Sequence, residues 1–218
     1  MKGAGKTPSG NQARADHQKL FDSSKVSKWW EDDEWVARTT QECRDFDYRG
    51  KIVMAPMVNA NKLTLRLEGL HYGADRVYSE EIFDFELAKS RRYYNKVFDK
   101  VDYICGDQDR SWGKVVWSTN KEEGRRVALQ LGTSEQGLAV TAALRVCKDV
   151  GAIDVNMGCP KDFSLRRGMG AALLTRPDRV SDILKALRRN LPEEVKLTAK
   201  IRLLDDVEEK FPQENFRV

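Results

Sequence analysis

Short apolar segments alternate with longer amphipathic stretches from residue 51 onward. The short segments predict β-strands, and the longer stretches, with apolar residues recurring every three or four positions, predict helices. Strands and helices in regular succession indicate β/α units with parallel strands, which place the chain in the α/β class. The five predicted strands are Ile52–Met57, Arg76–Ser79, Val127–Leu131, Ile153–Asn156 and Lys196–Leu203.

Two of the predicted helices have recognisable start signals. Thr133 with Gln136 three positions later matches a capping box, and this helix is expected to run to Gly151. Pro177 is expected to open the next helix, because proline is favoured in the first turn. Residues 101–119 instead have two apolar runs around a Gly/Asp-rich segment, which predicts a β-hairpin inserted after the second unit.

The first 45 residues are polar and show neither helical nor strand periodicity, which predicts a disordered N-terminal arm. The chain contains no signal-peptide core and no apolar run long enough for a membrane span. We therefore expect a cytoplasmic protein, with a nuclear or mitochondrial location left open. The four cysteines are widely spaced and form no CxxC pair, so we expect reduced thiols and no metal site.

Polar residues interrupt the apolar alternation at the carboxyl ends of three neighbouring strands. In a barrel, residues of one parity face the helices and residues of the other parity face the interior. The carboxyl ends of the strands are also where barrel enzymes keep their active sites. By this alternation the inward-facing side chains are Gln130, Asp154, Asn156, Thr198, Lys200 and Arg202.

Cys159 follows the fourth strand in the sequence Asn-Met-Gly-Cys-Pro. A single cysteine is most often a small hydrophobic core residue. This one precedes a proline in a loop and has Lys161, Arg166 and Arg167 nearby, a setting that keeps a thiol accessible. Cys159 is therefore a candidate acid or nucleophile.

The net charge of +4 is distributed unevenly. Residues 161–200 contain ten Lys or Arg residues and five Asp or Glu residues, an excess of five positive charges. Such a segment is either a solvated helix face or a surface that meets an anionic partner. The charge pattern alone does not decide between them.

Six segments, in order and spacing, resemble the flavin-dependent tRNA-dihydrouridine synthases, most closely the eukaryotic branch that modifies position 20 of tRNA. The resemblance covers about residues 50–205. The NMGCPK motif and the KIR motif are its most specific parts. The segments are MAPMV (54–58), GADRVYSEE (73–81), VALQLGT (127–133), IDVNMGCPK (153–161), GMGAALL (168–174) and AKIRL (199–203).

This resemblance implies a TIM barrel that binds FMN, is reduced by NADPH and reduces a uridine of tRNA that has been flipped out of its stack. It implies that Cys159 donates a proton to C5 of the uracil. The other roles implied are FMN binding by Pro56, Met57, Gln130 and Lys200, and substrate binding by Asn156, Lys161 and Arg202.

Beyond Leu204 the sequence departs from the family pattern, and the later barrel strands are missing. We therefore expect three segments: a disordered arm (1–45), the first part of a (β/α)8 TIM barrel with about five units (46–204), and a divergent tail (205–218). A second chain that completes the barrel is a further expectation. The alternatives left open are an inactive RNA-binding or partner fragment of such an enzyme, and another FMN barrel oxidoreductase.

Overall fold

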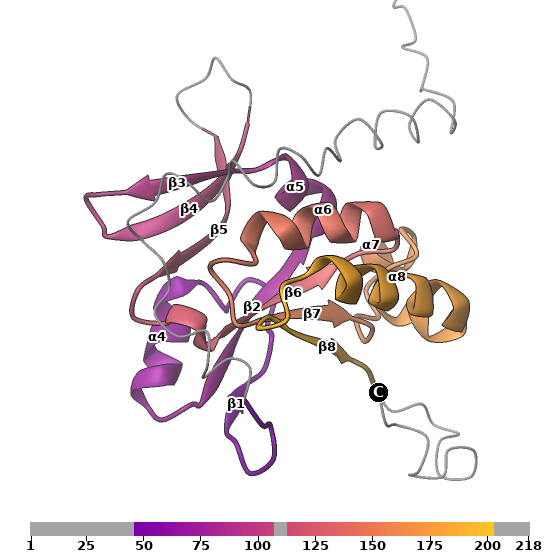
Figure 1. Cartoon of the computed structure of the whole chain (residues 1–218), viewed down its shortest axis with the longest axis horizontal. Coiled ribbons are helices and arrows are strands. Elements are labelled where there is room, and N and C mark those ends of the chain that lie inside the picture. The colour runs from indigo at the N-terminus through magenta and orange to yellow at the C-terminus, as the bar shows by residue number, and fades with distance from the viewer. Residues whose placement is uncertain (1–45, 107–112, 203–218) are drawn as a thin grey trace, which may run out of the picture.

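The computed structural model describes residues 46–106 and 113–202 (Figure 1). The predicted arm (1–45) and the predicted tail (205–218) lie outside the described residues, so these two expectations remain predictions.

Five parallel strands form the main sheet, as the hydrophobic pattern predicts. Their order in the sheet is β1-β2-β6-β7-β8, and each strand pairs in parallel with the next. Within the described residues β1 and β8 are the edges of the sheet, which gives half of a barrel. The strands are β1 (Val53–Met54), β2 (Arg76–Phe83), β6 (Val127–Gly132), β7 (Ala152–Asn156) and β8 (Lys196–Lys200).

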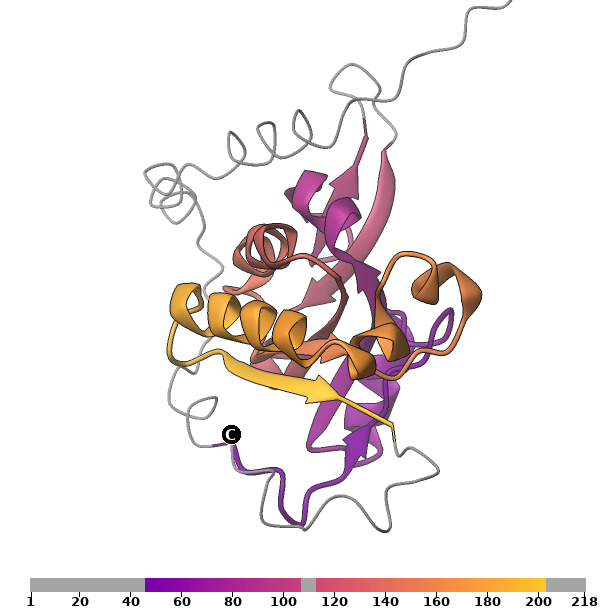
Figure 2. The same ribbon diagram turned by 90° about the vertical axis from the view of Figure 1, so that its right-hand side faces the viewer.

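Helices connect the parallel strands and cover the sheet. Figure 2 shows α6 and α8 side by side along one face of the sheet, with α8 next to β8. The side chains of Leu129, Ile153 and Leu187 are fully buried in this layer. The helices are α4 (Leu63–His71), α5 (Asp84–Lys89), α6 (Gln136–Val146), α7 (Asp162–Leu165) and α8 (Pro177–Asn190), with short 3-10 turns η2 (Gly124–Arg126) and η3 (Gly170–Thr175).

The bounds of three strands differ from the prediction by more than one residue. Strand β2 continues past Ser79 to Phe83, because Glu80 and Glu81 are buried by tertiary contacts that no apolar alternation signals. Strand β1 is limited to two residues, since the chain turns at Met57, whose carbonyl accepts hydrogen bonds from two later backbone amides. Strand β8 ends at Lys200, before the predicted end.

The predicted hairpin is part of a three-stranded antiparallel sheet made of β3 (Arg91–Asn95), β4 (Lys100–Cys105) and β5 (Lys114–Asn120). Pairing of β4 with β5 confirms the hairpin, whereas β3 escaped prediction because its charged sequence has no apolar alternation. The insertion is tied to the turn after α6, where buried Asp149 accepts hydrogen bonds from Tyr103 and, at 2.7 Å, from Arg92.

The start of α6 corrects the predicted capping box. The residue that caps the helix is Glu135, whose carboxylate accepts hydrogen bonds from the backbone amides of Gly137 (2.8 Å) and Leu138 (2.7 Å). The Thr133 hydroxyl donates instead to Asp84 at 2.6 Å and ties β6 to the start of α5. The predicted start of α8 at Pro177 is confirmed.

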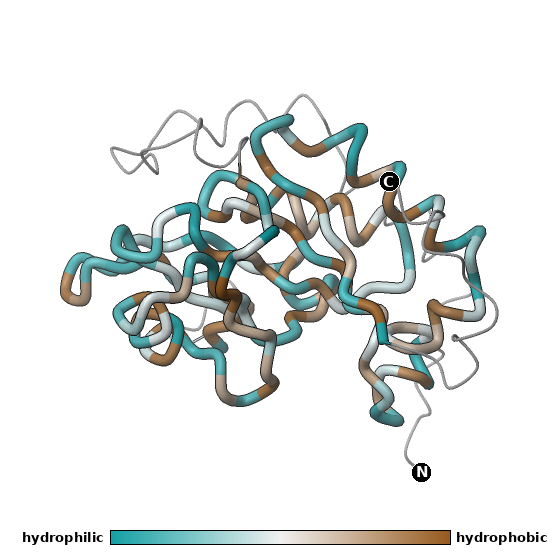
Figure 3. Tube along the Cα trace, turned by 90° about the horizontal axis from the view of Figure 1, so that it is seen from below, coloured by the Kyte–Doolittle hydropathy of each residue, from teal (hydrophilic) through white to brown (hydrophobic). Residues whose placement is uncertain are grey.

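Hydrophobic and hydrophilic positions interchange along the coloured part of the trace, which covers the described residues and shows no long apolar stretch (Figure 3). Among the described residues, no helix has both the length and the apolar character needed to cross a membrane. Side chains alternate between the two faces of the sheet. In β6, Val127, Leu129 and Leu131 pack toward the helices, and Ala128 and Gln130 lie on the other face.

Candidate active site

A layer of polar side chains spans β6, β7 and β8 on the face that the sequence predicts to point inward. The Gln130 amide donates a hydrogen bond to Asp154 at 2.8 Å and accepts one from Asn156 at 3.2 Å. The Thr198 hydroxyl donates to the second oxygen of Asp154 at 2.7 Å. The predicted convergence of these residues toward the carboxyl ends of neighbouring strands is therefore confirmed. We call this end of the sheet the mouth.

Asp154 lies at the centre of this layer and is almost fully buried. Burial raises the pKa of its carboxyl group, and the hydrogen bonds from Gln130 and Thr198 and the charge of Lys200 act against that shift. Lys200 ends β8 and is paired in register with Asn156, with its side chain exposed to solvent. The mouth therefore contains both a buried carboxyl group, Asp154, and an accessible cation, Lys200.

The Cys159 loop is held in place by Asn156 at the end of β7. The Asn156 side-chain oxygen accepts hydrogen bonds from the backbone amides of Gly158 and Cys159, both at 3.0 Å. The Cys159 carbonyl accepts a hydrogen bond from the amide of Ala171 at 2.9 Å. Because the backbone is fixed on both sides of the residue, the thiol of Cys159 is held at the mouth, where it is half-buried.

Glu81 is a residue of this region that the sequence analysis did not single out. The residue is 9% exposed, and neither carboxylate oxygen has a hydrogen-bond partner among the described residues. Burial raises the pKa of Glu81. A single sequence contains no signal for this burial, because the residues that bury Glu81 are distant along the chain.

Pro56 and Met57 lie in the turn after β1, where the Met57 side chain is 43% exposed. Asn61 holds this turn against β2: its side-chain amide donates to the carbonyl of Ala55 at 2.7 Å and to that of Tyr78 at 2.8 Å. Asn61 is fully buried and was also missed by the sequence analysis. These hydrogen bonds of Asn61 therefore fix the turn that follows β1, although β1 is only two residues long.

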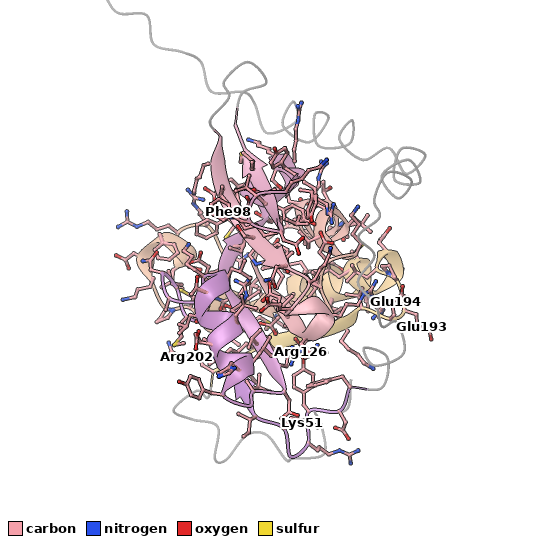
Figure 4. All side chains as sticks on the ribbon, turned by 90° about the vertical axis from the view of Figure 1, so that its left-hand side faces the viewer. Lys51, Phe98, Arg126, Glu193, Glu194 and Arg202 are labelled. Carbon is pink, nitrogen blue, oxygen red and sulfur yellow. The ribbon has the colours of Figure 1, made fainter. Side chains whose placement is uncertain are left out.

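The two predicted cationic substrate ligands are both exposed. Lys161 is the residue before α7, and Arg202 follows the end of β8. In Figure 4, Arg202 lies on the opposite side of the molecule from Glu193 and Glu194, which precede β8. The positive side chain of Arg202 is therefore at the end of β8 that also carries Lys200.

A cavity of about 370 Å³ lies beside α7 and is lined in part by Glu81, Phe83, Phe163 and Arg167. Phe83 contacts Phe163 edge to face, with ring centroids 5.9 Å apart. The Arg167 guanidinium lies 5.5 Å from the centre of the Phe83 ring, within the range of a cation–π contact. These contacts anchor α7, and with it the Cys159 loop, to the end of β2.

The chain matches a known protein family over most of its described length. A family model described as "Dihydrouridine synthase (Dus)" matches residues 53–217. The tRNA-dihydrouridine(20) synthase [NAD(P)+] of Saccharomyces cerevisiae is 44% identical over 162 residues, which are 72% of this chain and 42% of the yeast protein. The tRNA-dihydrouridine(20) synthase [NAD(P)+] of Schizosaccharomyces pombe is 39% identical over 165 residues, 75% of this chain and 34% of that protein.

A more distant human relative, the tRNA-dihydrouridine(20a/20b) synthase [NAD(P)+]-like protein, is 27% identical over 156 residues, which are 71% of this chain and 43% of the human protein. This chain thus spans less than half the length of these relatives. The family model nevertheless covers the parallel sheet, the Cys159 loop and the polar layer of the mouth. The chain belongs to the dihydrouridine synthase family.

Proposed function

We propose that this protein acts in the FMN-dependent reduction of uridine to 5,6-dihydrouridine in tRNA, with NADPH as the reductant. The observation that carries the proposal is the position of Cys159 after the carboxyl end of β7, where its backbone amide is held by Asn156, which contacts Gln130 and pairs in register with Lys200. The family match and the names of the relatives support the choice of tRNA and of a nicotinamide reductant.

The residues of the mouth fit the flavin by the chemistry of their donors. Gln130 retains hydrogen-bonding capacity after its contacts with Asp154 and Asn156, because a primary amide has two donor hydrogens and two acceptor lone pairs. The exposed Lys200 ammonium would stabilise negative charge on a reduced ring. Pro56 and the exposed Met57 would line the ring through their backbone and apolar surface.

When bound, FMN would supply hydride to C6 of the uracil. The role of this chain is to position the substrate and deliver the proton: Asn156 and Arg202 orient the uracil, and Cys159 gives its thiol proton to C5. Lys161, Arg202 and the surrounding excess of cations would contact tRNA phosphates, which carry one negative charge per nucleotide.

The decisive experiment compares a protein of these 218 residues with one extended through the remaining barrel strands of the family. We expect the extended protein to purify yellow and to introduce dihydrouridine into unmodified tRNA, measured by mass spectrometry. We expect the 218-residue protein to be colourless, because β1 and β8 are open edges among the described residues and half of the barrel wall is missing from the described sheet. A colourless, inactive extended protein would refute the proposed function.

The open edges also favour a second candidate, an RNA-binding or partner fragment without activity of its own. If a second chain completed the barrel, this fragment would become part of an active enzyme, as the first candidate requires. A binding titration with unmodified tRNA, performed on the 218-residue protein, separates the two from a barrel oxidoreductase that does not act on RNA. We place the activity in the cytoplasm, with the nucleus and mitochondria as the other compartments to examine with a fluorescent tag.

A further inference from the structure

Three exposed apolar side chains from different elements meet around the cavity beside α7. They are Val58 in the turn after β1, Val115 in β5 and Phe163 in α7, and these residues are 53%, 47% and 45% exposed. Exposed apolar side chains that gather around a cavity indicate a binding site, whereas single ones do not. The described lining of this cavity contains no member of the polar layer, so the cavity is a place distinct from that layer.

The 3-10 turn η3 holds α7 next to the Cys159 loop. The amide of Ala171 in this turn donates to the Cys159 carbonyl at 2.9 Å. A Cβ atom at the neighbouring Gly170 would lie 2.6 Å from that carbonyl oxygen and 2.6 Å from the Ser164 hydroxyl oxygen of α7. Because η3 touches both segments, α7 lies beside the Cys159 loop, and Phe163 is close to the site proposed for the target uridine.

The Phe163 ring is anchored at one side. Its partner is the Phe83 ring, which it meets edge to face, and Phe83 stacks on Phe85 with ring centroids 5.4 Å apart. The Arg167 guanidinium lies 5.5 and 4.8 Å from the centres of these two rings. A ring held by such contacts loses little conformational freedom when a ligand binds. The exposed part of Phe163 is therefore a preorganised surface for a planar ligand.

Paired charges line the cavity, and an excess of positive charge lies at its rim. The two lysines of the lining are each paired with a carboxylate, Lys62 with Glu80 and Lys114 with Glu86. The segment that carries Phe163, residues 161–167, has three cationic side chains and one acidic side chain. An uncharged ring with an anionic group on either side matches this distribution, and a nucleobase between two phosphates has that chemistry.

The flipping of a uridine creates a need for such a surface. A base that leaves the stack for chemistry deprives its neighbours of their stacking partner, and this loss must be offset by contacts with the enzyme. Stacking on an aromatic side chain is suited to this task, because every base has a π face. Proteins that bind single-stranded RNA combine aromatic stacking with contacts from Lys and Arg to the phosphates. Phe163 and the cations around it provide both.

We propose that Phe163 is the stacking platform for a nucleobase that neighbours the target uridine in the RNA strand, and that this base occupies the cavity beside α7. The phosphates on either side of the base meet Lys161 and Arg166, which are both exposed. This inference rests on the proposed function, because it assigns a second position of the same RNA substrate. Phe163 binds the strand and takes no part in the transfer of a proton or hydride.

The first test uses the 218-residue protein and a fluorescein-labelled single-stranded RNA with one central uridine. A second probe keeps the uridine and has an abasic ribose on each side of it. We expect the wild type to bind the intact probe roughly tenfold more tightly than the abasic probe, measured by fluorescence anisotropy. Phe163→Ala should bind both probes equally. Phe163→Trp should recover the wild-type preference, because the indole ring restores a π face.

Phe98→Ala is the matched control. Phe98, in the turn between β3 and β4, is more exposed than Phe163 and lies outside the lining of the cavity beside α7, so this variant should keep the wild-type preference. Circular dichroism establishes that each variant is folded. Equal affinity of the wild type for the two probes would overturn the inference, and so would an equal loss on both probes in Phe163→Ala or a failure of the wild type to bind the intact probe.

Salt dependence separates stacking from charge. In Phe163→Ala we expect the slope of log affinity for the intact probe against log salt concentration to stay as in the wild type, because no phosphate contact is lost. In Lys161→Met the slope should decrease by about 0.7, the contribution of one cation on a single strand. A decrease of the same size in Phe163→Ala would contradict a stacking role.

The second test uses the extended, flavin-containing protein. We expect Phe163→Ala to raise KM for tRNA at least about fivefold, while kcat and the rate of flavin reduction by NADPH stay within twofold. An unchanged KM would overturn the inference. Failure of the extended wild-type protein to reduce tRNA would refute the proposed function and would leave the titration of the two probes to decide whether Phe163 stacks on a base.

Discussion

Arg66 of α4 and Glu123, the residue before η2, form a two-point ion pair in the interior of the protein. The Nε and Nη2 atoms of Arg66 donate to the two Glu123 oxygens at 2.8 and 2.7 Å, and the two side chains are 1% and 0% exposed. The same guanidinium also donates to the carbonyls of Asn61 (2.8 Å) and Ser118 (2.6 Å). This pair joins α4 to the segment that follows the antiparallel insertion.

Removal of one member of this pair should strongly destabilise the protein. Arg66→Met leaves the Glu123 carboxylate buried without its partner, and we expect the free energy of unfolding to fall by about 3–5 kcal/mol. Urea unfolding followed by circular dichroism measures this loss. The double variant Arg66→Met/Glu123→Leu should regain most of it, since no orphaned charge remains. An unchanged urea midpoint in Arg66→Met would contradict the buried placement of the pair.

Replacement of Cys159 by Ala in the extended protein should separate the two half-reactions of the proposed function. Reduction of tRNA should fall by at least about a hundredfold, in line with the loss of a general acid. Reduction of the bound flavin by NADPH should be nearly unchanged, because Cys159 takes part only in protonation of the uracil. Stopped-flow flavin absorbance and tRNA mass spectrometry measure the two rates. Equal losses in both would remove Cys159 from the role of acid.

Lys200→Met should have the opposite effect on the half-reactions. Loss of an accessible cation next to the polar layer should weaken FMN binding at least about tenfold and slow flavin reduction, since charge on the reduced ring is no longer stabilised. Flavin fluorescence titration of the extended protein gives the dissociation constant. Lys196→Met, at the other end of the same strand, is the matched control. Unchanged affinity in Lys200→Met would refute the assignment.

Alkaline pH should destabilise the fold partly through Cys147. Burial raises the pKa of this thiol from 9.0 to about 12. Its neutral form is favoured in the folded state, so its contribution is fully present below pH 9 and is lost as pH rises toward 12. The loss amounts to about 1.4 kcal/mol per pH unit for one proton.

Urea unfolding at pH 8, 9, 10 and 11 checks this effect. In Cys147→Ala we expect a lower stability at neutral pH, from the lost packing, and a flatter decline above pH 9. Cys105→Ala, at a half-buried thiol, controls for the removal of a cysteine as such. Parallel stability curves for the wild type and Cys147→Ala would show that ionisation of Cys147 has no part in the alkaline decline.

Much of the parallel sheet could be predicted because its strands bury one apolar face against helices. Alternation located β6 and β7 to within one residue and also gave the inward-facing positions Gln130 and Asn156. The same rule failed for the second half of β2, where Glu80 and Glu81 are buried. The Glu80 carboxylate is held there by Lys62 and by the backbone amide of Asn59, which alternation along the strand cannot reveal.

The helix cap shows a second limit of prediction. Thr133 and Glu135 are both able to cap α6, and the sequence does not reveal that Asp84 takes the Thr133 hydroxyl. The same limit applies to the candidate site. Cys159 and Lys200 follow from motif and alternation, whereas Glu81 and Asn61 owe their positions to a bulge and to a turn that only the folded chain defines.

The antiparallel insertion has a consequence for the order of folding. Strands β3, β4 and β5 pair with their neighbours in sequence, as in Asn95 with Lys100, whereas β2 must wait for β6, about fifty residues later. Closing a short loop costs less chain entropy than closing a long one, so local pairs form sooner. Pulse-labelled hydrogen exchange should therefore protect the amide of Tyr103 before that of Gln130. The antiparallel insertion, which interrupts the barrel pattern in the sequence, would then fold before the barrel strands and provide the surface on which they assemble.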